Sequence, residues 1–138
     1  MDAVQLIARI MFVYLIVGSA IGHLTQTAAM AAYGESRGLP SAKAAVQVSG
    51  VALLLGGLSV LLGIWGDAGA LGLALLLVIT AVSMHGFWKD SDPQAKQMEM
   101  VQFNKDIALA GGALALYVTF YIDATGSYFW TITGPLFN

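Results

Sequence analysis

Four long apolar stretches, separated by polar or glycine-rich connections, dominate the hydrophobic pattern of this chain. Each is long enough to cross about 30 Å of hydrocarbon at roughly 1.5 Å per helical residue. The apolar positions do not alternate with a period of two, which argues against membrane strands. We therefore expect an all-α polytopic membrane protein, an antiparallel four-transmembrane-helix bundle in one domain over residues 1–138, with helices at about 4–24, 44–65, 68–88 and 106–122.

The connections between these stretches differ in length and character. "GDAG" between the second and third predicts a tight hairpin, and "TAAMAAY" before "GLP" predicts a short interfacial helix in the first loop. In the third connection, Asp92 and Pro93 are a cap and first-turn pair, so the last helix is expected to begin outside the membrane. The aromatic segment 123–138 is too short to span and is expected to lie along the interface, outside the bundle core.

Composition supports the membrane interpretation. Hydrophobic residues make up 58% and charged residues 10%, too few charges for the surface of a water-soluble domain. The net charge of −2 without a basic run argues against nucleic acid as a partner, and the absence of cysteine excludes thiolate and iron–sulfur chemistry by this chain. The first residues lack the positive charge of a signal peptide, so the first stretch is expected to be a retained helix.

The distribution of basic residues predicts an orientation. An even number of spans places the first and third connections on one side, and that side carries most of the positive charge, on Arg37, Lys43, Lys89, Lys96 and Lys105. The other side carries Arg9 alone. The positive-inside rule then places both long connections in the cytoplasm and both termini outside.

Ionisable residues inside membrane helices are costly, so each needs an explanation. Arg9 and Asp123 fall at the same end of the bundle, where we expect a structural ion pair, or else Arg9 snorkelling to lipid phosphate. The opposite end gathers a larger set of polar and aromatic residues, which we take as the candidate binding residues: Ser19, His23, His85, Trp88, Lys105 and Asp106.

Three interpretations of this polar end stay open. It could be a hydrogen-bonded layer that fixes helix packing. It could be a pocket for a small molecule such as a quinone headgroup, because a histidine near a lysine or aspartate can bind a carbonyl and exchange protons. It could also hold haem between His23 and His85, although the chain has no other haem signature. A four-ligand metal cage is not expected, and no metal or catalytic residue is assigned.

Several motifs resemble those of the DoxX family of small four-helix bacterial membrane proteins. The opening helix "ARIMFVYLIVGSAIGHL", the stretch "AAYGESRGLP" and the glycine-rich "GVALLLGGLSVLLGIW" are similar to family sequences. The most specific pair is "HGFW" followed by "QFNKDIALAGG", which matches the family's His-x-Phe-Trp, Phe-x-Lys and Gly-Gly pattern. Two positions depart from that pattern: His23 stands where the family usually has Lys, and Leu53 where it usually has Glu.

The resemblance implies a role at the quinone side of electron transfer. Family members associate with terminal quinol oxidase or form the membrane part of a thiosulfate:quinone oxidoreductase, in the bacterial inner membrane. We therefore expect a small subunit of a redox or respiratory complex that contributes to a quinone site and has no redox centre of its own. The alternative is a non-catalytic scaffold that stabilises a larger membrane complex; a solute transporter has less support, because no helix is visibly broken.

Overall fold

The computed structural model describes residues 2–123 and 130–137. Their regular elements are all helical: α1 (Asp2–Thr25), α2 (Thr27–Ser36), α3 (Ala42–Leu62), α4 (Gly66–Met84), the short 3₁₀ helix η1 (Phe87–Lys89) and α5 (Pro93–Ile122). Within these residues, α1, α3, α4 with η1, and α5 are long and apolar enough to cross a membrane. The predicted polytopic all-α class is therefore confirmed.

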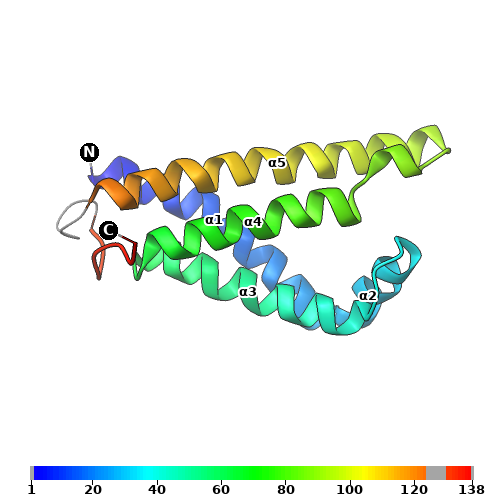
Figure 1. Ribbon diagram of the computed structural model, residues 1–138, viewed down its shortest axis with the longest axis horizontal. Coiled ribbons are helices and arrows are strands. Elements are labelled where there is room, and N and C mark those ends of the chain that lie inside the picture. Colours follow the sequence, from blue (N-terminus) through cyan, green and yellow to red (C-terminus); the bar gives the residue numbers. More distant parts are fainter. Residues whose placement is uncertain (1, 124–129, 138) are drawn as a thin grey trace.

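The four long helices lie nearly side by side, and α2 lies across one end of the bundle (Figure 1). Helix α1 packs chiefly on α3, α3 on α4, and α4 on α5, whereas α1 and α5 meet only briefly. One α1–α5 contact lies near Gly112, where an added Cβ would be 3.7 Å from the Phe12 ring. Both ends of the chain lie at the end opposite α2, as the even number of spans predicted (Figure 1).

The helices pack through small residues facing larger apolar ones. The buried apolar core includes Ala20, Ala70 and Ala113, packed with branched side chains such as Ile16 and Leu73. Because lipid supplies no hydrophobic force between helices, close backbone approach is the main source of packing energy here. Gly50 serves the same close approach between α3 and α1, since an added Cβ would lie 2.8 Å from the Cβ of His23.

The turn between α3 and α4 lies earlier than predicted. The predicted hairpin "GDAG" is instead the first turn of α4, and the chain reverses at Gly63 and Trp65, both in the left-handed region with φ of 63° and 47°. Gly63 tolerates this conformation because it has no Cβ. The shift moves Asp67 from an exposed turn to a fully buried position in the helix.

The other two connections follow the sequence pattern. The short interfacial helix is present as α2, and the chain leaves it through Gly38 at φ 86°. At the start of α5, the Asp92 carboxylate accepts the backbone N–H of Ala95 at 2.8 Å, with Pro93 in the first turn, as predicted. The membrane stretch expected from about residue 106 is thus the second half of a helix of 30 residues, about 45 Å long.

The described part of the aromatic tail, residues 130–137, is attached to the α3–α4 turn. The backbone N–H groups of Ile132 and Thr133 donate to the carbonyl of Gly63, at 3.2 and 3.0 Å. The Asp67 carboxylate accepts the N–H groups of Leu136 and Phe137, each at 2.8 Å. The tail is thus held to the bundle by backbone contacts, while Trp130, Ile132, Leu136 and Phe137 stay more than half exposed. The expected place of segment 123–138 along the interface stays a prediction, and residues 124–129 of it lie outside the described residues.

Candidate functional site

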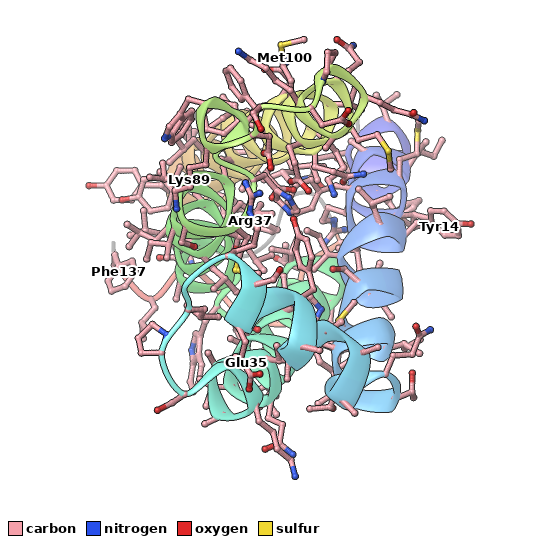
Figure 2. All side chains as sticks on the ribbon, turned by 90° about the vertical axis from the view of Figure 1, so that its right-hand side faces the viewer. Tyr14, Glu35, Arg37, Lys89, Met100 and Phe137 are labelled. Atoms are coloured by element: carbon pink, nitrogen blue, oxygen red, sulfur yellow. The ribbon has the colours of Figure 1, made fainter. Side chains whose placement is uncertain are left out.

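A polar cavity of about 150 Å³ lies inside the bundle at the end covered by α2. Its lining comes from all five α-helices. The polar members are Ser19, His23, Tyr33, Ser49, Thr80, His85, Lys105 and Asp106, and the apolar members are Met30, Val46, Leu53, Leu77 and Met84. Figure 2 looks onto this end, with α2 in front and a group of nitrogen and oxygen atoms behind it, near the labelled Arg37.

His85 occupies the centre of the cluster because α4 ends there. The residue is the C-cap of α4, and its N–H donates to the carbonyl of Ala81 at 3.1 Å. The chain then turns at Gly86 into η1, which leaves the imidazole facing α5. Its Nδ1 lies 2.8 Å from Glu99 Oε2. "HGFW" is thus both the end of a helix and part of a polar cluster.

Glu99 joins α2 to the same cluster. The hydroxyl of Tyr33 donates to Glu99 Oε1 at 2.6 Å, and the Tyr33 ring stacks on His85 with centroids 6.4 Å apart. Burial raises the pKa of the Tyr33 hydroxyl well above its usual range, and the hydrogen bond to the Glu99 carboxylate raises it further. Tyr33 therefore stays a hydrogen-bond donor at physiological pH.

Asp106 is the buried carboxylate of the cavity, with 4% of its surface exposed. Its Oδ1 lies 3.3 Å from Lys105 Nζ, and its Oδ2 lies 3.8 Å from His85 Nε2. The second distance is too long for a direct hydrogen bond and too short to admit another atom between the two, so a polar group bound beside them in the cavity could contact both. Asp106 thus places an acceptor near Nε2 of His85, the ring nitrogen that does not contact Glu99.

Arg37 braces the loop that carries His85. Its guanidinium donates to the carbonyls of Met84 and Gly86 at 2.9 and 3.1 Å, and to Asp90 Oδ1 at 2.8 Å. The hydrogen bond to Asp90 raises the pKa of Arg37 above its usual value. Guanidinium donors satisfy the last carbonyls of a helix well, because several N–H groups diverge from one plane. α2 and the α4–α5 connection are therefore held as one unit.

The structure brings together five of the six residues predicted for this end. Ser19, His23, His85, Lys105 and Asp106 all line the cavity. Trp88 does not: it is half exposed and packs edge-on against Phe87 and Phe103 at the outer end of α5. Both histidines line the cavity, and the haem hypothesis that joined them stays a prediction; no group of three or more His, Asp or Glu side chains suited to a metal occurs within residues 2–123 and 130–137.

Sequence reasoning missed Tyr33, Arg37 and Glu99. Glu99 precedes Asp106 by seven residues, two helical turns, so both face the same side of α5. The spacing of Glu99 and Asp106 could therefore have indicated a shared face, given a last helix that begins at Pro93. Tyr33 and Arg37 lie on and just after a short helix with no marked polarity, and only the folding of α2 over the bundle places them at the site.

The opposite end of the bundle contains a second, separate polar group. Arg9, Asp67 and Asp123 are all buried there. The Arg9 guanidinium donates to the carbonyl of Trp130 at 3.3 Å and lies 5.8 Å from the centre of the Phe120 ring. Because Arg9 is fully enclosed by protein, the snorkelling alternative is wrong. The ion pair between Arg9 and Asp123 stays a prediction.

Comparison with known proteins identifies the family. The DoxX family model matches residues 4–86, which covers α1 to the end of α4 and reaches His85 but not α5. Neither a search of curated proteins nor a search of solved structures found a match. Since the matched region is more than half of the 138 residues, the chain belongs to the DoxX family of membrane proteins.

Proposed function

We propose that this protein is a small membrane subunit of a redox or respiratory complex and that its polar cavity binds the headgroup of a lipid-soluble quinone. One observation carries the proposal: His85 Nε2 and Asp106 Oδ2 face each other across 3.8 Å inside a cavity of the bundle. Glu99 and Lys105 hold the outer sides of this pair, and a ligand oxygen bound beside it in the cavity could contact both groups. A quinone, when bound, supplies reversible electron and proton chemistry.

The donors and acceptors of the cavity suit a quinone carbonyl or hydroxyl. Because Nδ1 of His85 is held by the Glu99 carboxylate, Nε2 is left to face the cavity, as acceptor when neutral and as donor when protonated. Lys105 Nζ supplies a further donor beside Asp106. The volume of about 150 Å³ is below the roughly 300–1,000 Å³ of pockets for whole drug-sized ligands, so it suits a headgroup.

A chain of polar side chains connects this cavity to the aqueous end of the molecule. It runs from Asp106 to His85, then to Glu99 and Tyr33, with separations of 3.8, 2.8 and 2.6 Å. Glu99 lies about 10 Å from Asp106 along α5, towards the part of the helix that exceeds the thickness of the hydrocarbon layer. These groups would hold and pass protons between the cavity and water, with a polar group of the bound ligand linking Asp106 to His85.

The two departures from the family pattern fall in this same cavity. His23 and Leu53 both line it, and so does Asp106. The family usually carries a carboxylate at the position of Leu53. In this chain the buried carboxylate of the cavity is instead Asp106 of α5. This favours a retained headgroup site whose specificity differs from that of relatives with Lys and Glu at those positions.

The electrons would come from a partner subunit. The chain has no cysteine, and its described residues contain no cluster suited to a metal. We also propose the bacterial inner membrane as the location, with the α2 end in the cytoplasm and both termini in the periplasm, since the basic residues of the connections gather at the α2 end.

Quinone retention tests this proposal. The protein is purified in mild detergent from native membranes, and extracted quinone is quantified per mole of protein for wild type, His85→Ala, Lys105→Ala and the double variant. We expect bound quinone in wild type and its loss in His85→Ala at temperatures where the variant stays folded; because His85 is also a partner of Glu99, its thermal stability should fall as well. Glu35→Gln, an exposed substitution on α2, is the control. The two alanine substitutions should be coupled by about 0.5 kcal/mol or more, through Asp106.

The scaffold alternative predicts a different set of results. A scaffold would co-purify with larger subunits at fixed stoichiometry and carry no quinone, and His85→Ala would lower stability alone. Strict additivity of His85→Ala and Lys105→Ala in both measurements would show that the two residues do not share a site.

A further inference from the structure

A second, more open cleft lies between α1 and α5. Its volume is about 380 Å³, and its two walls come from these helices, while α3 and α4 contribute one residue each to its floor. The lining residues are Tyr14, Leu15, Ile16, Gly18 and Ser19 of α1, Lys105, Asp106 and Leu109 of α5, and Leu53 and Leu77 of the floor. Apart from Ser19, Lys105 and Asp106, and the phenol of Tyr14, this lining is apolar.

The cleft and the polar cavity adjoin. Five residues line both, namely Ser19, Leu53, Leu77, Lys105 and Asp106. Leu53 and Leu77 form a shared floor, and the shared side chains mark the boundary between the two spaces. Asp106 and Lys105 thus line both spaces, whereas His85 lines the polar cavity and not the cleft.

The outer side of the cleft faces the membrane. Tyr14 is 80% exposed and Leu15 41% exposed, although both lie in the middle of a membrane-spanning helix. In Figure 2 the Tyr14 side chain projects from α1 away from the bundle. The α1–α5 contact near Phe12 and Gly112 lies beyond the cleft, on the side away from α2.

We propose that the α1–α5 cleft is the lateral passage by which a single-tailed amphiphile reaches the polar cavity, its head placed at His85 and Asp106 and its one apolar chain lying in the cleft. This inference rests on the proposed function and adds the route and the ligand class. Lipid hydrocarbon solvates an apolar chain as well as the cleft does. The cleft therefore adds little affinity for the chain, but it must stay open for the chain of a bound ligand to leave the bundle, so a side chain that fills the cleft should lower equilibrium binding of a tailed ligand.

Gly18 keeps the passage open. A Cβ added at Gly18 would meet no atom within 4 Å, and the residue lines the cleft wall directly. A side chain placed there would occupy cleft space without displacing a neighbouring helix. Gly72 is the matched control, because it is also an exposed helical glycine with nothing within 4 Å of an added Cβ, and it is not among the residues that line either space.

The test compares a tailed quinone with its ring-only analogue. Wild type, Gly18→Ala, Gly18→Val, Gly18→Leu and Gly72→Leu are reconstituted in lipid nanodiscs, and binding of a decyl-tailed benzoquinone and of the same ring without a tail is measured by equilibrium partition. We expect binding of the tailed compound to fall progressively with side-chain size, by about tenfold for Gly18→Leu. Ring-only binding should stay within about twofold of wild type, and Gly72→Leu should match wild type for both.

The outcomes separate the two proposals. If wild type binds neither compound, the proposed function fails. If wild type binds both and Gly18→Leu binds the tailed compound as wild type does, the headgroup site stands and the lateral passage is overturned. Equal losses of tailed and ring-only compound in Gly18→Leu would also overturn it, because they would show a collapsed cavity. Helical circular dichroism and thermal unfolding are measured on every variant, and the Ala and Val substitutions supply the test if Leu fails to fold.

Discussion

Glu99 Oε2 lies 2.8 Å from His85 Nδ1, while the other oxygen of the same carboxylate accepts the hydroxyl of Tyr33 at 2.6 Å. One side chain of α5 thus joins α2 to the end of α4. Because the carboxylate is only 16% exposed, water does not easily replace either partner. The orientation of His85 in the cavity depends on this contact.

Replacing Glu99 should loosen the site more than its position near the surface suggests. Glu99→Gln removes the charge and leaves an amide that can accept from only one of the two partners, so we expect a loss of about 1–2 kcal/mol in the free energy of unfolding. Thermal or denaturant unfolding in detergent measures the loss, and quinone retention should fall with it. Glu35→Gln should change neither. Equal stability of the two variants would mean that the Glu99 contacts contribute little.

Asp67 and the C-terminal segment should depend on each other. Deleting residues 131–138 leaves the buried Asp67 carboxylate without the N–H groups of Leu136 and Phe137, so we expect a loss of about 1.5–3 kcal/mol. The deletion should cost clearly less in an Asp67→Ala background, because no buried charge is then left unpaired. Equal costs in the two backgrounds would show that the segment does not stabilise the bundle through Asp67, and no cost in either would show that it is dispensable.

Arg37 should not be replaceable by lysine. Lysine retains the charge but cannot reach the carbonyls of Met84 and Gly86 and the Asp90 carboxylate together, so Arg37→Lys should cost about 1–2 kcal/mol. Amide hydrogen exchange should rise in α2 and in residues 84–90. Lys43→Arg, at an exposed position at the start of α3, is the control. Unchanged exchange in α2 would contradict the bracing role.

Gly50 should be required for the contact of α1 with α3. An added Cβ would lie 2.8 Å from the Cβ of His23 and 3.0 Å from Leu24 Cδ2, so Gly50→Ala must separate the two helices. We expect a loss of about 1–3 kcal/mol and a widened polar cavity. Gly72→Ala places the same methyl group in open space and should be neutral or stabilising by up to about 1 kcal/mol. Equal effects of the two substitutions would argue against the close contact.

The orientation in the membrane can be tested with reporter fusions. The structure places both termini at one end and the α2 connection at the other (Figure 1). A reporter enzyme that is active only in the periplasm should therefore be active after Asn138 and silent after Asp90. The reverse pattern would invert the topology and move the cavity to the periplasmic side.

The sequence by itself determined the class, the number of spans and the end at which the polar residues gather. Runs of apolar residues of that length leave little choice in a bilayer, because every backbone group must be satisfied within its own helix. Local signals with a local mechanism were also readable. The Asp92–Pro93 start of α5 is one, since the cap and the capped N–H are three residues apart.

Only the tertiary structure decided which polar residues share a site. Tyr33, His85 and Glu99 come from three separate elements, and their contact depends on how α2 folds over the bundle. Asp67 reads as a turn residue in the sequence and becomes buried because the chain reverses at Gly63 and Trp65. Trp88 belongs to the same "HGFW" motif as His85, yet its side chain is half exposed and does not line the cavity. Hydropathy sets which segments enter the membrane, whereas the partners of a buried polar group are fixed by contacts between helices far apart in the chain.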